Sequence, residues 1–201
     1  MNIKSLALKL MLLSALCATA AVAHAQNTRT TAGGMTNVKL STAFVEALTA
    51  LDVTPGTVYP TEIEKRVASF PIIGGAIDLD TAAGNILHSG GLTLSAGGKV
   101  VTLESFIIDT TGKQPVITGL VLLNNKLLGR FPLFDLTLPN GISLPLMPNG
   151  SMLQLKGVAV ALDPAAATTL NGVYSVSAFA GGFSIGTANV TLITSRCHNS
   201  E

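Results

Sequence analysis

Two short runs of alternating residues, joined by a pair of glycines, constrain the fold of this chain more than any other feature of its sequence. In the first run, Leu92 and Leu94 alternate with a threonine and a serine. In the second run, Val101 and Leu103 alternate with a threonine and a glutamate, and Ala-Gly-Gly-Lys separates the two runs. Alternation with a period of two on both sides of a Gly-Gly turn is typical of a β-hairpin. We therefore expect these runs to form two antiparallel strands.

Further short extended segments, separated by turn signals, occur along most of the chain. Outside the hairpin they are expected within 70–91 and at 37–40, 116–123, 127–138, 153–162, 173–179 and 183–193. Pro132 predicts an edge strand or a bulge, and Gly157 shifts the alternation of its segment and predicts a bulge. Many short strands at regular turn spacing indicate a mostly β fold, either an antiparallel β-sandwich or an open barrel.

Two short helices are predicted where strands end. The first follows Ser41 or Thr42, either of which can cap a helix whose apolar residues fall on one face. The second begins with Asp163 as its N-cap and Pro164 at the first helical position, and Asn171-Gly172 supplies its stop. The strand that precedes each helix has a similar sequence. We expect the two helices to close the two ends of the sandwich or barrel.

Residues 1–25 have the pattern of a secretory signal peptide. Lys4 and Lys9 accompany an apolar run that is too short to span a bilayer, and Ala-His-Ala completes the segment. This pattern predicts cleavage after Ala25 and a secreted or periplasmic protein. The leucine before Cys17 disfavours a lipoprotein, because lipoprotein signal peptidase requires a small residue there. No later segment is apolar for long enough to predict a transmembrane helix.

The mature chain divides into three predicted parts. Residues 26–35 are polar and rich in glycine and threonine, which predicts a flexible N-terminal arm. Residues 36–195 predict a single β-rich domain, large enough to bury about two thirds of its unfolded surface. Residues 196–201 are expected to form a C-terminal tail. Cys197 is the one cysteine left after cleavage, so we expect a free thiol in this tail and no internal disulfide.

The charge balance argues against nucleic acid and anionic membranes as partners. The formal net charge of the whole chain is +1. It becomes −1 when the two lysines of the signal peptide are removed, and no run of Lys or Arg remains. Proteins that bind polyanions normally carry a basic patch or stripe. We therefore expect no nucleic acid partner.

The chain contains two weak matches to motifs that carry chemistry. Residues 182–186 match the G-x-S-x-G expression, but that motif requires a turn from a strand into a helix, and here a strand is expected to follow. Asp78 and Asp80 resemble the start of a calcium loop, but Ala82 occupies the position of the third ligand. We therefore predict a non-catalytic protein without a metal site.

His88 is the one histidine in the body of the mature chain, and it lies in a loop-like His-Ser-Gly-Gly segment. A lone histidine in a β-protein is usually structural or simply exposed. The alternative is a contact with a ligand, because the neighbouring glycines are expected to leave the imidazole accessible. Both interpretations remain open from the sequence.

The order of residues also resembles a known family. The relevant residues are Phe70 with Gly74-Gly75, Ile86-Leu87-His88, Gly90-Gly91-Leu92 and, upstream, Val38-Lys39 with Ser41. They resemble the HtaA domain, a secreted module of bacterial haem-uptake and surface proteins. The resemblance covers most of the mature chain.

This resemblance implies a β-sandwich with short helices and a haem-binding site. In that family a tyrosine of the first helix holds the haem iron, helped by a serine of that helix and a histidine of the sheet. Carried over to this chain, the serine is Ser41 and the histidine is His88. Val45 occupies the tyrosine position, and the nearest alternative tyrosine is Tyr59. The resemblance therefore implies Ser41, Tyr59 and His88 as candidate ligand-binding residues, with haem as the candidate cofactor.

Two functions follow from these observations. The first is an exported, non-catalytic HtaA-like binding module for haem or another apolar ligand, which predicts an apolar pocket near the first helix and His88. The second is a structural or adhesive cell-surface protein without a small-molecule ligand. It predicts an exposed strand edge and self-association, or contact with cell-surface partners.

Overall fold

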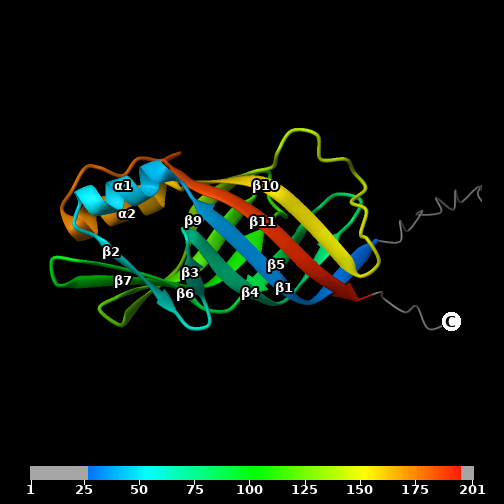
Figure 1. The fold of residues 1–201 in the computed structure, drawn as a ribbon, viewed down its shortest axis with the longest axis horizontal. Coiled ribbons are helices and arrows are strands. Elements are labelled where there is room, and N and C mark those ends of the chain that lie inside the picture. The colour runs from blue at the N-terminus through cyan, green and yellow to red at the C-terminus, as the bar shows by residue number, and fades with distance from the viewer. Residues whose placement is uncertain (1–26, 196–201) are drawn as a thin grey trace, which may run out of the picture.

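Most of the described chain belongs to one antiparallel β-sheet, which two short helices accompany (Figure 1). The computed structural model describes residues 27–195. The predicted signal peptide (1–25) and the predicted tail (196–201) with Cys197 lie outside these residues. In chain order the elements are β1 (Thr28–Leu40), α1 (Thr42–Ala50), β2 (Thr54–Val58), β3 (Glu62–Glu64), β4 (Val67–Asp78), β5 (Gly84–His88), β6 (Gly91–Ala96), β7 (Lys99–Asp109), β8 (Val116–Leu123), β9 (Lys126–Thr137), β10 (Met152–Leu162), α2 (Pro164–Tyr174) and β11 (Ser184–Ser195). This architecture confirms the expected mostly β fold with two short helices.

Eight of the strands form a closed barrel. Their order is β7-β5-β4-β1-β11-β10-β9-β8, and β8 pairs back with β7. All of these pairings are antiparallel. In Figure 1, β1, β11 and β10 run side by side across the front of the barrel. Of the two arrangements that the sequence indicates, the structure therefore has the barrel, and the β7–β8 pairing closes it.

At one end the barrel wall opens into a wider structure. β10 pairs with β9 only through Ala159–Leu162 opposite Phe134–Thr137, and the chain then leaves the sheet to form α2. On the other side, β6 and β2 extend the sheet beyond β7. Within the described chain, the first half of β9 therefore pairs with β8 on one edge and with no strand on the other, and the outer edge of β2 is also unpaired. Helices α1 and α2 lie over this end (Figure 1).

The expectation that the two helices close opposite ends is wrong, because both lie at the same end. The strands that lead into them, β1 and β10, both pair antiparallel with β11. Those strands therefore run parallel to each other and deliver their helices to one end of the barrel. Within residues 27–195, neither helix is long and apolar enough to cross a membrane.

The predicted flexible arm at 26–35 is also wrong from residue 28 onward. This segment is the first part of β1, and it pairs with β11 on one side and β4 on the other. Its glycines permit close strand contact: a Cβ atom on Gly34 would lie 2.0 Å from the carbonyl oxygen of Thr191. Gly33 follows a bulge in the pairing with β11. The small, polar composition thus reflects tight packing of strands in the sheet.

The charged segment 61–69 contains β3 and the start of β4. These two strands form a hairpin in which Ile63 lies opposite Ala68. Lys65 and Arg66 make the turn with φ values of 48° and 66°. Two consecutive residues with positive φ suit the twist of a two-residue hairpin, although glycine or asparagine is the usual choice there. Because the turn lacks that usual signature, the hairpin could not be recognised from the sequence.

Helix α2 begins as expected but ends later. It continues through Asn171-Gly172, and the segment 173–179, expected to be extended, is helix and then loop. Ser175 takes the left-handed cap conformation that glycine normally supplies, with φ 57°. The side chain of Asn171 instead bonds the backbone N–H and C=O of Phe179, at 3.0 and 2.8 Å. It thereby fixes the loop that follows the helix.

Three local predictions are confirmed. In the β6–β7 hairpin, Leu92 lies opposite Leu103 across the Gly-Gly turn. The register of β9 shifts beside Pro132, as expected for a bulge. The register of β10 shifts at Gly157, also as expected.

Candidate ligand-binding site

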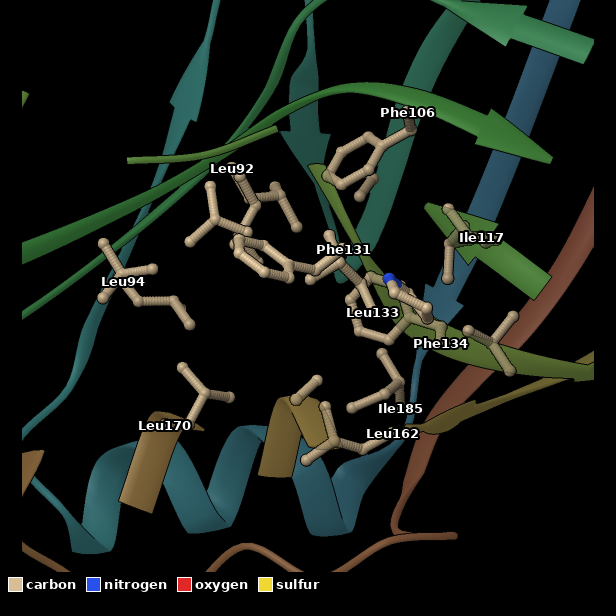
Figure 2. Close-up of a pocket in the computed structure, with 18 of the residues that line it drawn as sticks. Leu92, Leu94, Phe106, Ile117, Phe131, Leu133, Phe134, Leu162, Leu170 and Ile185 are labelled. Carbon is tan, nitrogen blue, oxygen red and sulfur yellow. The ribbon is translucent and has the colours of Figure 1, made fainter. Parts of the chain in front are cut away.

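An apolar cavity lies between the helices and the open end of the sheet. Its volume is about 200 Å³. Side chains from β6, β7, β8, β9, α1 and α2 line it, together with residues of β1, β4, β5, β10 and β11. Figure 2 shows Leu92 and Leu94 on one side of the space and Leu170 of α2 on another. Apart from two threonines and one histidine, the lining residues are aliphatic, aromatic or proline.

The alternation in the sequence explains why leucines face this cavity. Successive side chains of a strand point to opposite faces, so Leu92 and Leu94 share one face of β6. On α2, Ala166 and Leu170 are four residues apart and share one face of the helix. Phe44 of α1 adds an aromatic ring. The hairpin that dominates the sequence thus forms one wall of the cavity.

Aromatic rings pack at the inner end of the cavity. The rings of Phe70 and Phe106 meet edge to face with centroids 5.4 Å apart, and Phe134 lies 6.5 Å from Phe106. Gly119 of β8 makes room for them, because a Cβ atom there would lie 2.7 Å from Leu133 and 2.9 Å from Phe106. The glycine therefore helps to shape the cavity.

Helix α2 is attached to the strands beneath it at both ends. At its start, Asp163 caps the helix by accepting from the amides of Ala165 and Ala166, and its own amide donates to the Leu133 carbonyl of β9 at 3.0 Å. Near its end, the Tyr174 hydroxyl donates to the Leu94 carbonyl at 2.7 Å. The Lys99 ammonium donates to a carbonyl of the same helical turn, that of Val173. These contacts hold α2 over the cavity on the β6–β7 side.

The side of the cavity along the first half of β9 carries exposed apolar side chains. Leu128, Phe131 and Pro132 line the cavity and are also exposed to solvent. We refer to these three residues as the mouth. On this half of β9, the edge opposite β8 pairs with no strand of the described chain, so the mouth connects the cavity with solvent.

His88 lies inside the barrel, so the expectation of an accessible imidazole is wrong. Its side chain is 4 % exposed. Its Nε2 is 2.8 Å from the Thr36 hydroxyl, and its Nδ1 is 3.3 Å from the Phe106 carbonyl oxygen. His88 is the last residue of β5, and the alternation of that strand places it on the same inward face as Ile86.

The hydrogen bonds define the state of this imidazole. A carbonyl oxygen can only accept, so Nδ1 carries the proton and Nε2 accepts from the Thr36 hydroxyl. Burial lowers the pKa of His88 from 6.5 to about 4, although the contacts with the backbone of Phe106 and Ile86 oppose that shift. His88 is therefore neutral near pH 7, and the lining of the cavity carries no charge.

The other two sequence-predicted residues lie outside the cavity lining. Ser41 is the N-cap of α1: its hydroxyl accepts from the Phe44 amide at 3.0 Å and donates to the Ser184 carbonyl at 2.8 Å. Tyr59 lies in the turn between β2 and β3 and is 92 % exposed. Of the three, His88 alone lines the cavity.

Thr36 is the residue of this site that the sequence interpretation missed. It lies on β1 two residues before Val38 and is 2 % exposed. The period of two places it on the inward face with Val38, and that alternation was the available signal.

The lining residues do not fit coordination of haem iron. Haem iron takes His, Cys, Met or Tyr from proteins. Among the lining residues His88 is the one member of this set, and both of its nitrogens are engaged. An engineered cavity of about 150 Å³ binds benzene, so about 200 Å³ is small for a porphyrin. Within residues 27–195, no group of three His, Cys, Asp or Glu residues could hold a metal ion.

Comparison with solved structures identifies the fold. The C-terminal domain of HtaA from Corynebacterium glutamicum matches with a TM-score of 0.65 and 11 % sequence identity, over 83 % of this chain and 99 % of that domain. The N-terminal domain of the same protein matches with a TM-score of 0.60 and 12 % identity, over 84 % and 100 % of the two chains. The haem-binding protein HtaB of that organism matches with a TM-score of 0.54 and 10 % identity, over 84 % and 95 %.

The resemblance to HtaA domains in the sequence is thus confirmed at the level of the fold. No protein-family model and no curated protein matches this sequence. At 10–12 % identity, the likeness establishes the shared fold.

Proposed function

We propose that this protein is an exported, non-catalytic binding module of HtaA-like fold that holds an apolar small molecule in the cavity between its helices and its sheet. The observation that carries the proposal is the uncharged, almost wholly apolar lining of that cavity. Export rests on the signal-peptide pattern of residues 1–25.

The hydrophobic effect supplies the driving force for such binding. Removing apolar surface from water contributes roughly 25 cal/mol per Å². Small-molecule sites are typically concave and mostly apolar, with a few polar groups that fix the orientation of the ligand. This cavity has that composition, with Thr36 and His88 as its buried polar groups. Among residues 27–195, no carboxylate, lysine, cysteine or serine lines it, so the proposal assigns no reaction.

Haem is the other candidate ligand. The support for haem comes from the fold, because one structure that shares it is described as a heme-binding protein. The support for a smaller apolar ligand comes from the engaged imidazole of His88 and the size of the cavity. We therefore favour the smaller ligand.

Two titrations of the mature protein test the proposal. A neutral dye that fluoresces in apolar surroundings should bind saturably, with one dye per chain. Haemin, followed through its Soret band, should give no shift that depends on His88 or Tyr59, as tested with His88→Ala and Tyr59→Phe. A saturable Soret shift that one of these variants abolishes would instead establish haem coordination. Absence of saturable dye binding would contradict the proposal.

Exposed apolar side chains favour a second candidate, a structural or adhesive surface module. Met147 is 81 % exposed and Leu144 is 52 % exposed, both in the loop between β9 and β10. Exposed apolar patches commonly mark sites of protein association. This candidate predicts self-association that rises with concentration and weakens in Met147→Lys, measured by sedimentation velocity. A monomer at all concentrations would argue against self-association.

A further inference from the structure

The buried polar groups of the cavity are confined to one point, the Thr36–His88 pair. The other polar lining residue, Thr169, lies on the exposed face of α2. Thr36 and His88 are both buried, and the Phe70–Phe106 ring pair packs within the same lining. A ligand that enters through the mouth therefore meets a single hydrogen-bonding position inside the barrel.

The hydrogen bonds within this pair determine which further hydrogen bonds it can make with a ligand. The imidazole uses Nδ1–H on the Phe106 carbonyl and Nε2 as the acceptor for Thr36. The Thr36 hydroxyl has one proton, which it donates to His88, and its oxygen keeps two lone pairs as acceptors. The pair can therefore accept a hydrogen bond from a ligand at Thr36 Oγ1, and it has no proton left to donate.

The electrostatic surroundings restrict the ligand further. None of the described residues that line the cavity carries a charged side chain. Burying an ionised carboxylate or ammonium group without a partner costs far more than burying an apolar group. A carboxylic acid or an amine that is ionised near pH 7 is therefore excluded from the interior.

We infer that the natural ligand class is an uncharged apolar alcohol, which places its hydroxyl group against Thr36 Oγ1 and its hydrocarbon body between α2 and strands β6–β9. This inference rests on the proposed function and specifies its ligand. A hydroxyl group supplies the proton that Thr36 can accept, whereas the carbonyl of a ketone or ester offers only lone pairs. The hydroxyl end enters first, because the hydrogen-bonding position is buried and the mouth is exposed.

Ligands with one hydrocarbon skeleton test the inference by calorimetric titration of the mature protein at pH 7. Menthol carries the hydroxyl, menthone has a carbonyl at the same position, p-menthane has neither, and the corresponding carboxylic acid is ionised. One hydrogen bond predicts that menthol binds about fivefold to tenfold more tightly than menthone. The acid should bind more weakly than all three.

Variants at Thr36 assign the preference to this residue. In Thr36→Val the ratio of menthone to menthol dissociation constants should fall to about one, and in Thr36→Ser it should persist. If Thr36→Val does not fold, the ratio of the menthone and menthol dissociation constants in the natural protein and in Thr36→Ser still decides whether the site prefers an alcohol.

The outcomes separate this inference from the proposed function. Equal affinity for menthol and menthone, or tight binding of the acid, would overturn the inference that the ligand is an alcohol. The proposed binding of an apolar molecule would still hold. Failure of p-menthane, menthol and the dye to bind would overturn both.

Discussion

The hydroxyl of Thr36 lies 2.8 Å from Nε2 of His88, and 52 residues separate the two in the chain. The bond links β1 to β5, which flank β4 in the barrel. Both side chains are buried, and the Thr36 hydroxyl is the donor for Nε2 of His88. This pair is both a structural contact and the polar end of the proposed ligand site.

Replacing Thr36 with valine should destabilise the protein, because Nε2 of His88 would keep a buried lone pair without a donor. We expect a loss of about 1–3 kcal/mol in the free energy of unfolding, measured with urea. Thr31 offers a matched control on the same strand, since it is also buried and its hydroxyl has no hydrogen-bond partner among the residues that the structure describes. Thr31→Val should be neutral or stabilising. Equal losses in the two variants would contradict the structural role of the Thr36–His88 bond.

Stability should fall between pH 6.5 and 4 because of His88. Its pKa is lowered to about 4 in the folded protein, chiefly by burial, so the unfolded chain binds the proton more readily. The stability that depends on the neutral imidazole is fully present above pH 6.5 and is lost as the pH falls through 4. The upper limit of this loss is about 3 kcal/mol, at about 1.4 kcal/mol per pKa unit. Urea unfolding at several pH values should show this slope, and His88→Gln should flatten it.

Three carboxylates with shifted pKa values bear on this measurement. Burial, together with the nearby Asp163, raises the pKa of Asp135 above 3.8, so its protonation adds stability to the folded protein as the pH falls and opposes the trend from His88. The pKa values of Asp78 and Asp109 are lowered from 3.8 by hydrogen bonds, chiefly from the side chains of Thr81 and Thr111. Their contributions are therefore lost below the range in which His88 titrates. An unchanged slope in His88→Gln would show that another group causes the pH dependence.

Adding a methyl group at Gly119 should displace side chains that line the cavity. The new Cβ atom would lie within 3 Å of the buried side chains of Leu133 and Phe106. Overpacking of this kind costs about 1–3 kcal/mol. We expect Gly119→Ala to lower both stability and dye affinity. Gly74→Ala is the control, because a Cβ atom there meets nothing within 4 Å. Similar dye affinity in both variants would mean that Gly119 does not shape the site.

The features that could be predicted from the sequence are those that depend on residues close together in the chain. The β6–β7 hairpin, the caps at Ser41 and Asp163 and the bulge at Gly157 all follow from local chemistry. The hairpin at Lys65-Arg66 was missed because its turn lacks the usual glycine or asparagine.

Features that depend on distant pairing could not be derived in the same way. Closure of the barrel by β7 and β8, and the position of both helices at one end, follow from which strands pair. The segment 28–35 looks flexible until β4 and β11 are placed on either side of it.

The candidate site was predicted in part. Alternation with Ile86 and with Val38 would have placed His88 and Thr36 on inward faces, yet their contact needs the order β1-β4-β5. The glycines after His88 suggested exposure, whereas Gly90 lies close to Thr61 and Val58. The proposed roles of Ser41 and Tyr59 remain predictions.

The measurement that tests the central claim most directly is dye binding by two single-tryptophan variants of α2. The natural chain has no tryptophan. Leu170→Trp adds a large ring to the lining of the cavity, whereas Thr168→Trp adds the same ring to an exposed position of the same helix that does not line it. We predict that Leu170→Trp loses at least tenfold in dye affinity and that Thr168→Trp keeps the affinity of the natural protein. Equal affinity in the two variants would place the binding site elsewhere and contradict the account.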